Sequence, residues 1–246
     1  MRFDVITLFP DMVLSAASHG VTGRALEKAI VSLSVWNPRD FVNDIHRTVD
    51  DRPYGGGPGM VMKYEPLLDA LSVAKKDSQV SGRVIYLSPQ GKPMTQELLN
   101  QASRSNRLIM VAGRYEGIDE RFIRDCCDEE WSLGDFVISG GELAALVVID
   151  AITRLLPGTL GAEQSAQQDS HVQGILDFPH YTRPEVIDGK SVPKVLLSGN
   201  HVEIARWRLK QSLGITWLKR PDLLEKLELS NEQLILLEEF KIEFDG

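Results

Sequence analysis

The sequence predicts an α/β protein in which a largely parallel β-sheet is followed by a small helical domain. Three short apolar segments support the sheet, and each ends at a loop that contains proline or glycine: Phe3–Phe9, Val84–Leu87 and Leu108–Ala112. Such segments are typical of strands that are buried on both faces. Glu65–Ala74 has a helical pattern and separates two of them. Strands that alternate with helices favour parallel pairing.

The first part of the chain ends with an unusually apolar helix. At the beginning of the chain, the first strand stops before Pro10, so a helix is expected to start near Asp11. Later, Leu143–Leu156 is apolar on nearly every side, and it must therefore be covered on more than one face. A subunit interface could provide this cover. Gly158–Gly174 then follows, and its Gly, Ala, Gln and Ser content suits a mobile linker.

Two helical segments are predicted after this linker. Leu223–Phe240 is rich in leucine at helical spacing, and His201–Leu213 has four apolar residues on one helical face, namely Val202, Ala205, Leu209 and Leu213. We therefore expect three parts, a first domain over 1–157, a flexible linker over 158–174 and a helical domain over 175–246.

Composition limits the class of protein. The chain has 246 residues, of which 43% are hydrophobic, so a substantial core is available. Cys126 and Cys127 are adjacent, which excludes an ordinary disulfide framework and a zinc site of four cysteines, and suggests a reducing compartment. No apolar stretch approaches the ~20 residues that span a bilayer, and the N-terminus lacks the features of a signal peptide. We expect a cytoplasmic protein with no membrane partner.

The charge distribution is compatible with a nucleic-acid partner. The net charge of −8 argues against one at first, because phosphate binding usually needs a basic surface. However, the segment 204–221 contains five cations and no acids, namely Arg206, Arg208, Lys210, Lys219 and Arg220. Eight acids follow from Asp222 onward. This segregation predicts one basic and one acidic face, with an ordinary solvated helix surface as the alternative.

Two glycine-bearing segments predict a small-molecule pocket. Gly113–Gly117 follows a buried strand, and Ser132–Glu142 leads into a helix. Glycines at such positions let backbone atoms approach a ligand closely, at the edge of the sheet where α/β proteins bind ligands. A third segment, Asp50–Gly59, is rich in glycine but lacks the Lys and Ser/Thr of a P-loop. It is either a ligand loop of another kind or a plain flexible loop.

Five segments in order resemble the bacterial tRNA (guanine-N1)-methyltransferases of the TrmD type, in the SPOUT superfamily. They are Asp50–Met60, Tyr86–Gly91, Gly113–Arg121, Glu130–Asp135, and Asp177 with Pro179–Pro184. The resemblance covers almost the whole chain. It implies a SPOUT-type parallel sheet tied in a deep trefoil knot, and a homodimer with its active site at the subunit interface. It also implies S-adenosyl-L-methionine as methyl donor and tRNA as substrate.

The resemblance implies a cofactor site made of three loops. The first comprises Tyr86, Leu87, Ser88 and Pro89. The second contributes Gly113, Tyr115 and Glu116. The third contributes Ser132, Leu133, Gly134, Asp135, Phe136, Val137, Ile138, Gly140 and Gly141. For any single apolar member, core packing is the alternative.

The implied reaction is methylation of N1 of the guanosine at tRNA position 37, immediately 3′ of the anticodon, with a preceding guanosine as part of the signal. Guanine N1 carries a proton at neutral pH, so the chemistry needs a base and a cation near the carbonyl oxygen. The resemblance assigns the base to Asp169 and the cation to Arg154. As alternatives, Arg154 could pair with Asp150 at i,i+4, and Asp169 could be a solvated residue or a helix cap.

Residues of the linker and the helical domain are the implied tRNA contacts, through stacking and phosphate binding. They are Ser165, Asp177, His180, Tyr181, Arg183, Trp207, Arg208 and Lys210. Trp207 at helical spacing could instead belong to the core. The resemblance also implies that Mg²⁺ can assist, with Glu116 as a candidate for placing charge near the cofactor amine or an ion. No dedicated metal site is legible.

The chain departs from the family pattern at Ala144, where proline is usual, at His171, which replaces a common aromatic residue, and at Phe178, where cysteine is frequent. None of these changes removes a proposed catalytic group. Two alternatives remain open at this stage. One is a related knotted methyltransferase that acts on another RNA, and the other is a non-catalytic RNA-binding module.

Overall fold

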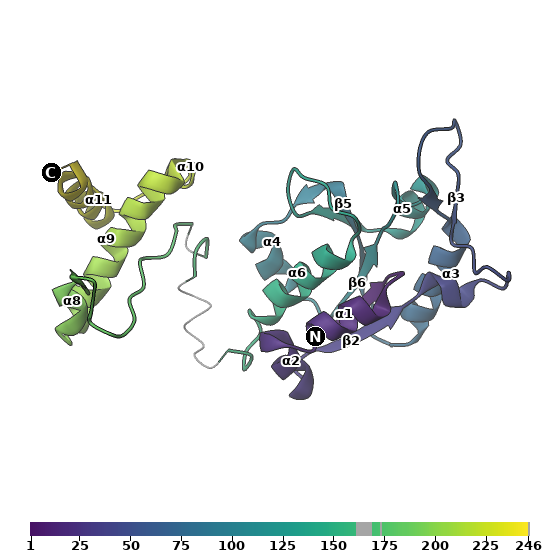
Figure 1. Ribbon diagram of the computed structural model, residues 1–246, viewed down its shortest axis with the longest axis horizontal. Helices are drawn as coiled ribbons and strands as arrows, with labels where there is room; N and C mark the ends of the chain where they lie inside the picture. Colours follow the sequence, from purple (N-terminus) through teal and green to yellow (C-terminus); the bar gives the residue numbers. More distant parts are fainter. Residues whose placement is uncertain (161–168, 173, 246) are drawn as a thin grey trace. The chain divides into compact units, whose positions relative to one another are not determined.

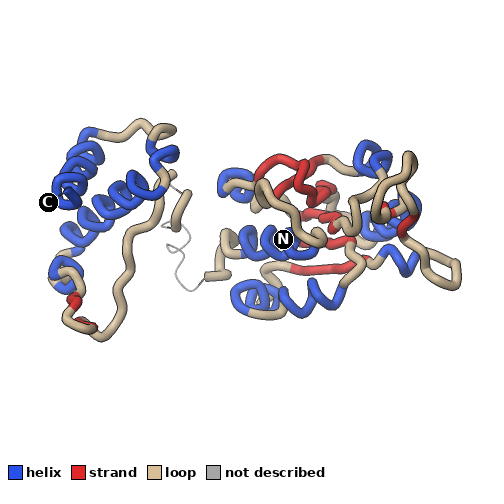
Figure 2. The backbone as a smooth tube through the Cα atoms, turned by 45° about the horizontal axis from the view of Figure 1, so that its top comes forward, coloured by secondary structure: helices blue, strands red, loops and turns tan. Residues whose placement is uncertain are grey.

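The computed structural model describes residues 1–160, 169–172 and 174–245, which divide into two compact units, Met1–Glu163 and Gln164–Gly246. The first unit contains a five-stranded sheet in the order β2-β1-β6-β5-β7, and every pairing in it is parallel. Helices lie on both faces of this sheet (Figures 1 and 2). The strands are β1 (Arg2–Ile6), β2 (Ser32–Trp36), β5 (Arg83–Pro93), β6 (Arg107–Ala112) and β7 (Glu129–Ser132).

The three predicted strands are confirmed, but β5 extends beyond the predicted Val84–Leu87. Its first half pairs with β7 at Glu129–Trp131, and after a shift of register Lys92 and Pro93 pair with the end of β7. The extra length was not visible in the hydrophobic pattern, because the second half of β5 is largely exposed. It crosses β7 closely at Gly91, where a Cβ would lie 2.5 Å from the backbone nitrogen of Trp131.

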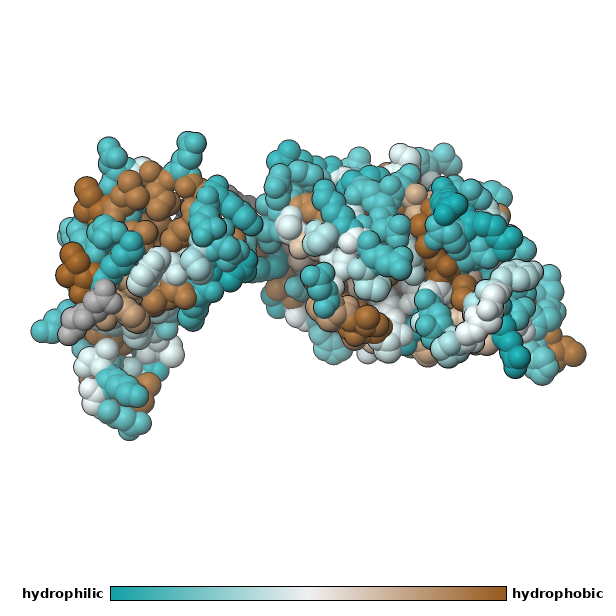
Figure 3. Space-filling view, turned by 90° about the horizontal axis from the view of Figure 1, so that it is seen from above, coloured by the Kyte–Doolittle hydropathy of each residue, from teal (hydrophilic) through white to brown (hydrophobic). Residues whose placement is uncertain are grey.

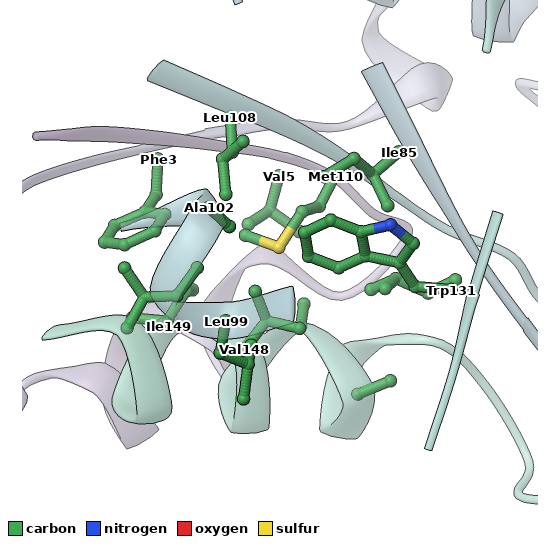
Figure 4. Close-up of a cluster of buried hydrophobic side chains, with 14 of the residues drawn as sticks. Phe3, Val5, Ile85, Leu99, Ala102, Leu108, Met110, Trp131, Val148 and Ile149 are labelled. Carbon is green, nitrogen blue, oxygen red and sulfur yellow. The ribbon is translucent and has the colours of Figure 1, made fainter. Parts of the chain in front are cut away.

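One face of the sheet holds the larger core. Phe3, Met110 and Trp131 are fully buried there and pack against Val148 and Ile149 of the apolar helix (Figure 4). The helices on this face are α1 (Pro10–Ala17), α2 (Gly20–Glu27), α4 (Gln96–Ala102) and α6 (Glu142–Thr153). The start of α1 at Pro10 agrees with the prediction, since proline occupies its first turn.

The opposite face is covered by α3 (Tyr64–Lys76), α5 (Glu120–Cys126) and the short 3₁₀ helix η1 (Pro38–Phe41). Alternate strand residues point to this side, as the period of a strand requires, so that Ile109 and Val111 join Phe122 of α5. The two-residue strands β3 (Asp50–Asp51) and β4 (Val61–Met62) form an antiparallel pair. The glycine-rich segment lies between them.

The second unit is mainly helical, as predicted, with a small hairpin. The hairpin consists of β8 (Val186–Ile187) and β9 (Lys190–Ser191). The helices are α8 (Lys194–Leu197), α9 (His201–Lys219), α10 (Pro221–Leu224) and α11 (Asn231–Asp245). Leu213 of α9 and Leu236 and Leu237 of α11 form its buried core. None of the helices in the described ranges is long and apolar enough to cross a membrane.

The helical pattern of this unit was only partly right. The predicted helix over Leu223–Phe240 is two helices, because a capping box of Ser230 and Gln233 starts α11. The Ser230 hydroxyl accepts a hydrogen bond from the Gln233 backbone amide (3.2 Å), and the Gln233 side chain accepts one from the Ser230 backbone amide (2.8 Å). Val202 and Ala205 of the predicted apolar face are exposed, and only the C-terminal half of α9 is buried. Gly214 allows this half to pack closely on the ring of Phe240.

The predicted separation into a basic and an acidic face is wrong for three of the five cations. Arg206 pairs with Glu239 at 2.6 Å, and Lys210 pairs with Glu243 at the same distance. The reason is the packing of α11 on α9, which brings the acids of one helix to the bases of the other. Arg220 pairs with its neighbour Asp222 at 2.7 Å. Figure 3 also shows hydrophobic surface on both units.

A buried charge network lies in the sheet at Asp4. Its carboxylate accepts hydrogen bonds from the side chains of Arg2 (2.8 and 2.9 Å), Arg107 (2.8 Å) and Trp36 (2.9 Å), and both Asp4 and Arg107 are fully buried. Burial by itself raises the pKa of Asp4, but these hydrogen bonds outweigh it and hold the pKa below its ordinary value.

We expect Asp4→Asn to lower the free energy of unfolding at pH 7 by about 2 kcal/mol, because the buried guanidinium would face a neutral partner. A lowered native pKa stabilises the fold above the unfolded value of about 3.9 and loses its effect as the pH falls through the native value. The difference between wild type and variant should therefore shrink below pH ~4. Urea unfolding at pH 7 and pH 3 measures both effects.

Asp77→Asn is the matched control, because Asp77 binds the same Arg2 at 2.6 Å but is about half exposed. Its effect should be much smaller. Equal stability of the Asp4 and Asp77 variants would contradict the account of this network.

Candidate functional site

Three segments surround a cavity of about 290 Å³ in the first unit, and we refer to them as the cofactor loops. The second and third follow the carboxyl ends of β6 and β7. The first was predicted as a loop, but it lies inside β5, because this strand continues through a shift of register to pair again with the end of β7. Most residues that the sequence predicted for a cofactor line the cavity. From the first loop these are Tyr86, Leu87, Ser88 and Pro89. From the second and third loops they are Gly113, Tyr115, Glu116, Ser132, Leu133, Phe136, Val137, Ile138, Gly140 and Gly141.

Gly134 and Asp135 lie in the third loop but are not part of the cavity wall. Gly134 has φ +146°, and its amide donates to the Ser132 hydroxyl at 3.1 Å, so these residues form the turn of the loop. Conversely, five lining residues were missed, Arg114, Gly117, Trp131, Ser139 and Ala144. Four of them lie beside or between predicted residues, so the continuity of each loop could have found them. The fifth, Ala144, lies in the first turn of α6, beyond the third loop.

The second and third loops meet through their backbones. The Gly141 amide donates to the Gly113 carbonyl at 2.9 Å, and a Cβ on Gly141 would lie 2.7 Å from the Cα of Ala112. A Cβ on Gly113 would lie 2.9 Å from the ring of Tyr86. Both glycines are therefore required by close approach, and the cavity wall consists of main chain where they stand.

Tyr86 forms the floor beneath the second loop. Its side chain is nearly buried, and burial, with a smaller contribution from Glu130, raises the pKa of Tyr86 to about 12. The phenol therefore stays neutral throughout the physiological pH range and acts as a wall and a hydrogen-bonding group rather than as a base.

A buried ion pair holds the second and third loops together. Arg114 Nε donates to Glu142 Oε2 at 2.8 Å, and another guanidinium nitrogen donates to the Ser139 carbonyl at 3.2 Å. Glu142, in the first turn of α6, is fully buried and also accepts from the Thr7 hydroxyl at 2.8 Å. The guanidinium carbon lies 4.4 Å from the ring centre of Phe9. We call these contacts the Arg114–Glu142 clamp.

Six of the other predicted residues line two adjoining pockets in the second unit. Asp169 lines one of about 380 Å³ together with Asp177, Phe178 and Arg208. His180, Tyr181 and Arg183 line the other, of about 570 Å³, again with Phe178 and Arg208.

Aromatic rings and charges alternate along these pockets. Arg208 lies over the Phe178 ring at 4.7 Å, and His180 Nε2 lies 2.9 Å from Asp177 Oδ2. Trp207 is half-buried and lies outside the buried core of α9 and α11. Its ring centre is 6.4 Å from the ring centre of Tyr181. Lys210 is engaged with Glu243, which leaves it less available to RNA than the sequence suggested. Ser165 lies outside the described residues.

Comparison with known proteins identifies the family. The model of the family "tRNA (Guanine-1)-methyltransferase TrmD" matches residues 1–226. The chain belongs to the TrmD family. It is 63% identical to a tRNA (guanine-N(1)-)-methyltransferase of Methylococcus capsulatus, over 100% of this chain and 98% of the relative. It is 58% identical to that of Pseudoalteromonas translucida (98% and 94% covered) and 57% identical to that of Escherichia coli K12 (99% and 95% covered).

Membership of the TrmD family places the chain in the SPOUT superfamily and makes it a tRNA (guanine-N1)-methyltransferase. A methyltransferase of this family implies S-adenosylmethionine as methyl donor and tRNA as substrate. The parallel sheet and the helical C-terminal part agree with the predicted fold class.

The two predicted catalytic residues of this TrmD-family chain belong to different units. Arg154 follows the last turn of α6, where its amide donates to the Asp150 carbonyl at 3.1 Å. The Asp150 carboxylate accepts from the Thr22 hydroxyl at 3.4 Å, which ties α6 to α2. Asp169 lies at the start of a short turn, in which its carbonyl accepts from the Val172 amide at 3.3 Å. Within the described ranges, no cluster of three or more His, Cys, Asp or Glu side chains could hold a metal ion.

Proposed function

We propose that this protein transfers the methyl group of S-adenosylmethionine to N1 of the guanosine at tRNA position 37. The observation that carries the proposal is the meeting of three loops around one cavity in a chain that matches the TrmD family over residues 1–226. The preceding guanosine is part of the recognition signal. The target base must leave the stack to reach such a cavity.

The cavity wall fits the methyl donor. Leu87, Phe136 and Ile138 offer apolar surface to a purine ring, while the main chain at Gly113 and Gly141 offers amide and carbonyl groups that no side chain covers. Glu116 places a carboxylate on the same wall, which suits an ammonium group. When bound, S-adenosylmethionine supplies a methyl group on a positively charged sulfur. A Mg²⁺ ion that assists the reaction would be held near the Glu116 carboxylate, where it would supply positive charge.

Two side chains complete the chemistry. Asp169 accepts the proton of guanine N1, which makes that nitrogen nucleophilic. Arg154 donates hydrogen bonds to the guanine carbonyl oxygen, where negative charge builds as the proton leaves. The pocket beside Asp169 contains Phe178 and Arg208, a ring and a cation that suit a nucleotide. Asp177, His180, Tyr181 and Arg183 contact the nucleotides around the target.

We further propose a homodimer in which the active site draws on both subunits. Leu143 and Val147 of α6 are both nearly half exposed at i,i+4, although the helix is apolar on almost every side. Phe9 and Met12 at the start of α1 are exposed as well. A second copy of the chain would cover these side chains. The residues 1–157 form the knotted cofactor domain, 158–174 the linker and 175–246 the tRNA-binding domain.

Labelled methyl transfer tests the proposal. Two matched tRNA transcripts, with guanosine or adenosine at position 37, are incubated with the protein and labelled S-adenosylmethionine. Label on the guanosine transcript alone is the expected result. Absence of label from both, with tRNA binding intact, would support a binding module instead, and equal labelling would place the target at another nucleotide.

A further inference from the structure

The proposed function gives no role to the glycine-rich segment Asp50–Met60. The structure shows where it lies. Its end is joined to the second cofactor loop by main-chain hydrogen bonds: the Glu116 amide donates to the Met60 carbonyl, and the Met62 amide donates to the Gly117 carbonyl, both at 3.0 Å. The segment therefore forms the outer support of the loop that carries Glu116.

The contact at Gly59 is tighter than main-chain pairing requires. Gly59 has φ +80°, and a Cβ built on it would overlap the Glu116 side chain, with the carboxyl carbon only 2.8 Å away. The volume that any other residue would fill at position 59 is taken by the Glu116 carboxylate. Gly55 in the same segment has nearly the same backbone angle, φ +84°, yet nothing lies within 4 Å of its Cβ position.

We infer that Gly59 is a positioning residue for methyl transfer, because its missing side chain makes room for the Glu116 carboxylate at the wall of the cofactor cavity. The inference rests on the proposed function, in which Glu116 faces the cofactor. The Glu116 side chain is exposed and has room to rotate about its single bonds, so an added methyl group at position 59 would turn it to another rotamer rather than unfold the loop. The carboxylate would then leave its place while the main chain stays.

Gly59→Ala and Gly55→Ala separate this effect from backbone strain, since both place alanine at the same positive φ. We expect Gly59→Ala to lower methyl transfer at limiting S-adenosylmethionine by about tenfold or more, as misplaced groups in active sites do. Gly55→Ala should stay within about twofold of wild type, and the two variants should have similar melting temperatures.

The Glu116→Ala background provides the decisive comparison. If Gly59 acts through Glu116, then adding Gly59→Ala to Glu116→Ala should cause no more loss than adding Gly55→Ala. The inference would be overturned if Gly59→Ala caused its full loss of activity in the Glu116→Ala background as well. It would also be overturned if Glu116→Ala alone had no effect, or if Gly59→Ala and Gly55→Ala were equally active. If Gly59→Ala does not fold, the double variant Gly59→Ala/Glu116→Ala should fold, because it no longer has the overlap. A double variant that also fails to fold would overturn the inference.

Calorimetric binding of S-adenosylmethionine to the same variants gives a readout without tRNA. Weaker binding by Gly59→Ala than by Gly55→Ala supports the inference. Failure of the proposed function would be seen separately, as absence of methyl transfer by the wild-type protein.

Discussion

Asp169→Asn should lower the rate of methyl transfer by this protein by about 10²- to 10⁴-fold, while S-adenosylmethionine binds as before. Asparagine has nearly the shape of aspartate but cannot accept the N1 proton. The cofactor cavity lies in the other unit of the chain and is lined by residues of the three loops, so the substitution leaves its wall intact. Single-turnover transfer and calorimetric cofactor binding measure the two quantities.

Asp188→Asn is the matched control for this prediction. Asp188 is exposed in the turn between β8 and β9 with φ +48°, a conformation that asparagine tolerates. Its substitution replaces the same carboxylate by the same amide, in the same unit as Asp169. Its activity should equal that of wild type. Undiminished methylation by Asp169→Asn would eliminate Asp169 as the base and direct the search to another acceptor.

Arg114→Ala should lower the free energy of unfolding by about 3 kcal/mol, because it leaves the carboxylate of Glu142 buried without its cationic partner. The side chain of Glu142 is fully buried, and that of Arg114 is only 18% exposed, so water replaces little of the lost interaction. The clamp also joins the second and third cofactor loops, and the variant should therefore bind S-adenosylmethionine more weakly. Urea unfolding and calorimetry measure these effects.

Arg124→Ala serves as the comparison for the clamp. Arg124 forms an i,i+4 pair with Glu120 at 2.8 Å, but its side chain is 75% exposed, so its removal should cost much less. The account of the clamp is wrong if both variants have the same stability and the same cofactor affinity.

The sheet and most of the cavity wall could be predicted from the sequence because their signals are local. Buried strands such as Leu108–Ala112 are continuous apolar runs, and the glycines that follow them mark the ligand edge of a parallel sheet. The capping box of Ser230 and Gln233 was equally local. It was overlooked because the leucine spacing on both sides suggested one continuous helix.

Contacts between distant segments could not be read in this way. Arg114 and Glu142 are 28 residues apart, and nothing in either segment shows that the two loops meet. The same holds for Arg206 and Lys210, whose partners are set by the packing of α11 on α9. The support of Glu116 by Gly59 depends on a pairing between the glycine-rich segment and the second loop that only the fold reveals.

The central claim is the atom that receives the methyl group. The most direct measurement is digestion of the reacted tRNA to nucleosides, with the methylated product identified by mass spectrometry and its position mapped by sequencing. The account predicts 1-methylguanosine at position 37 and at no other position. A guanosine methylated at another atom, or 1-methylguanosine elsewhere in the tRNA, would contradict it.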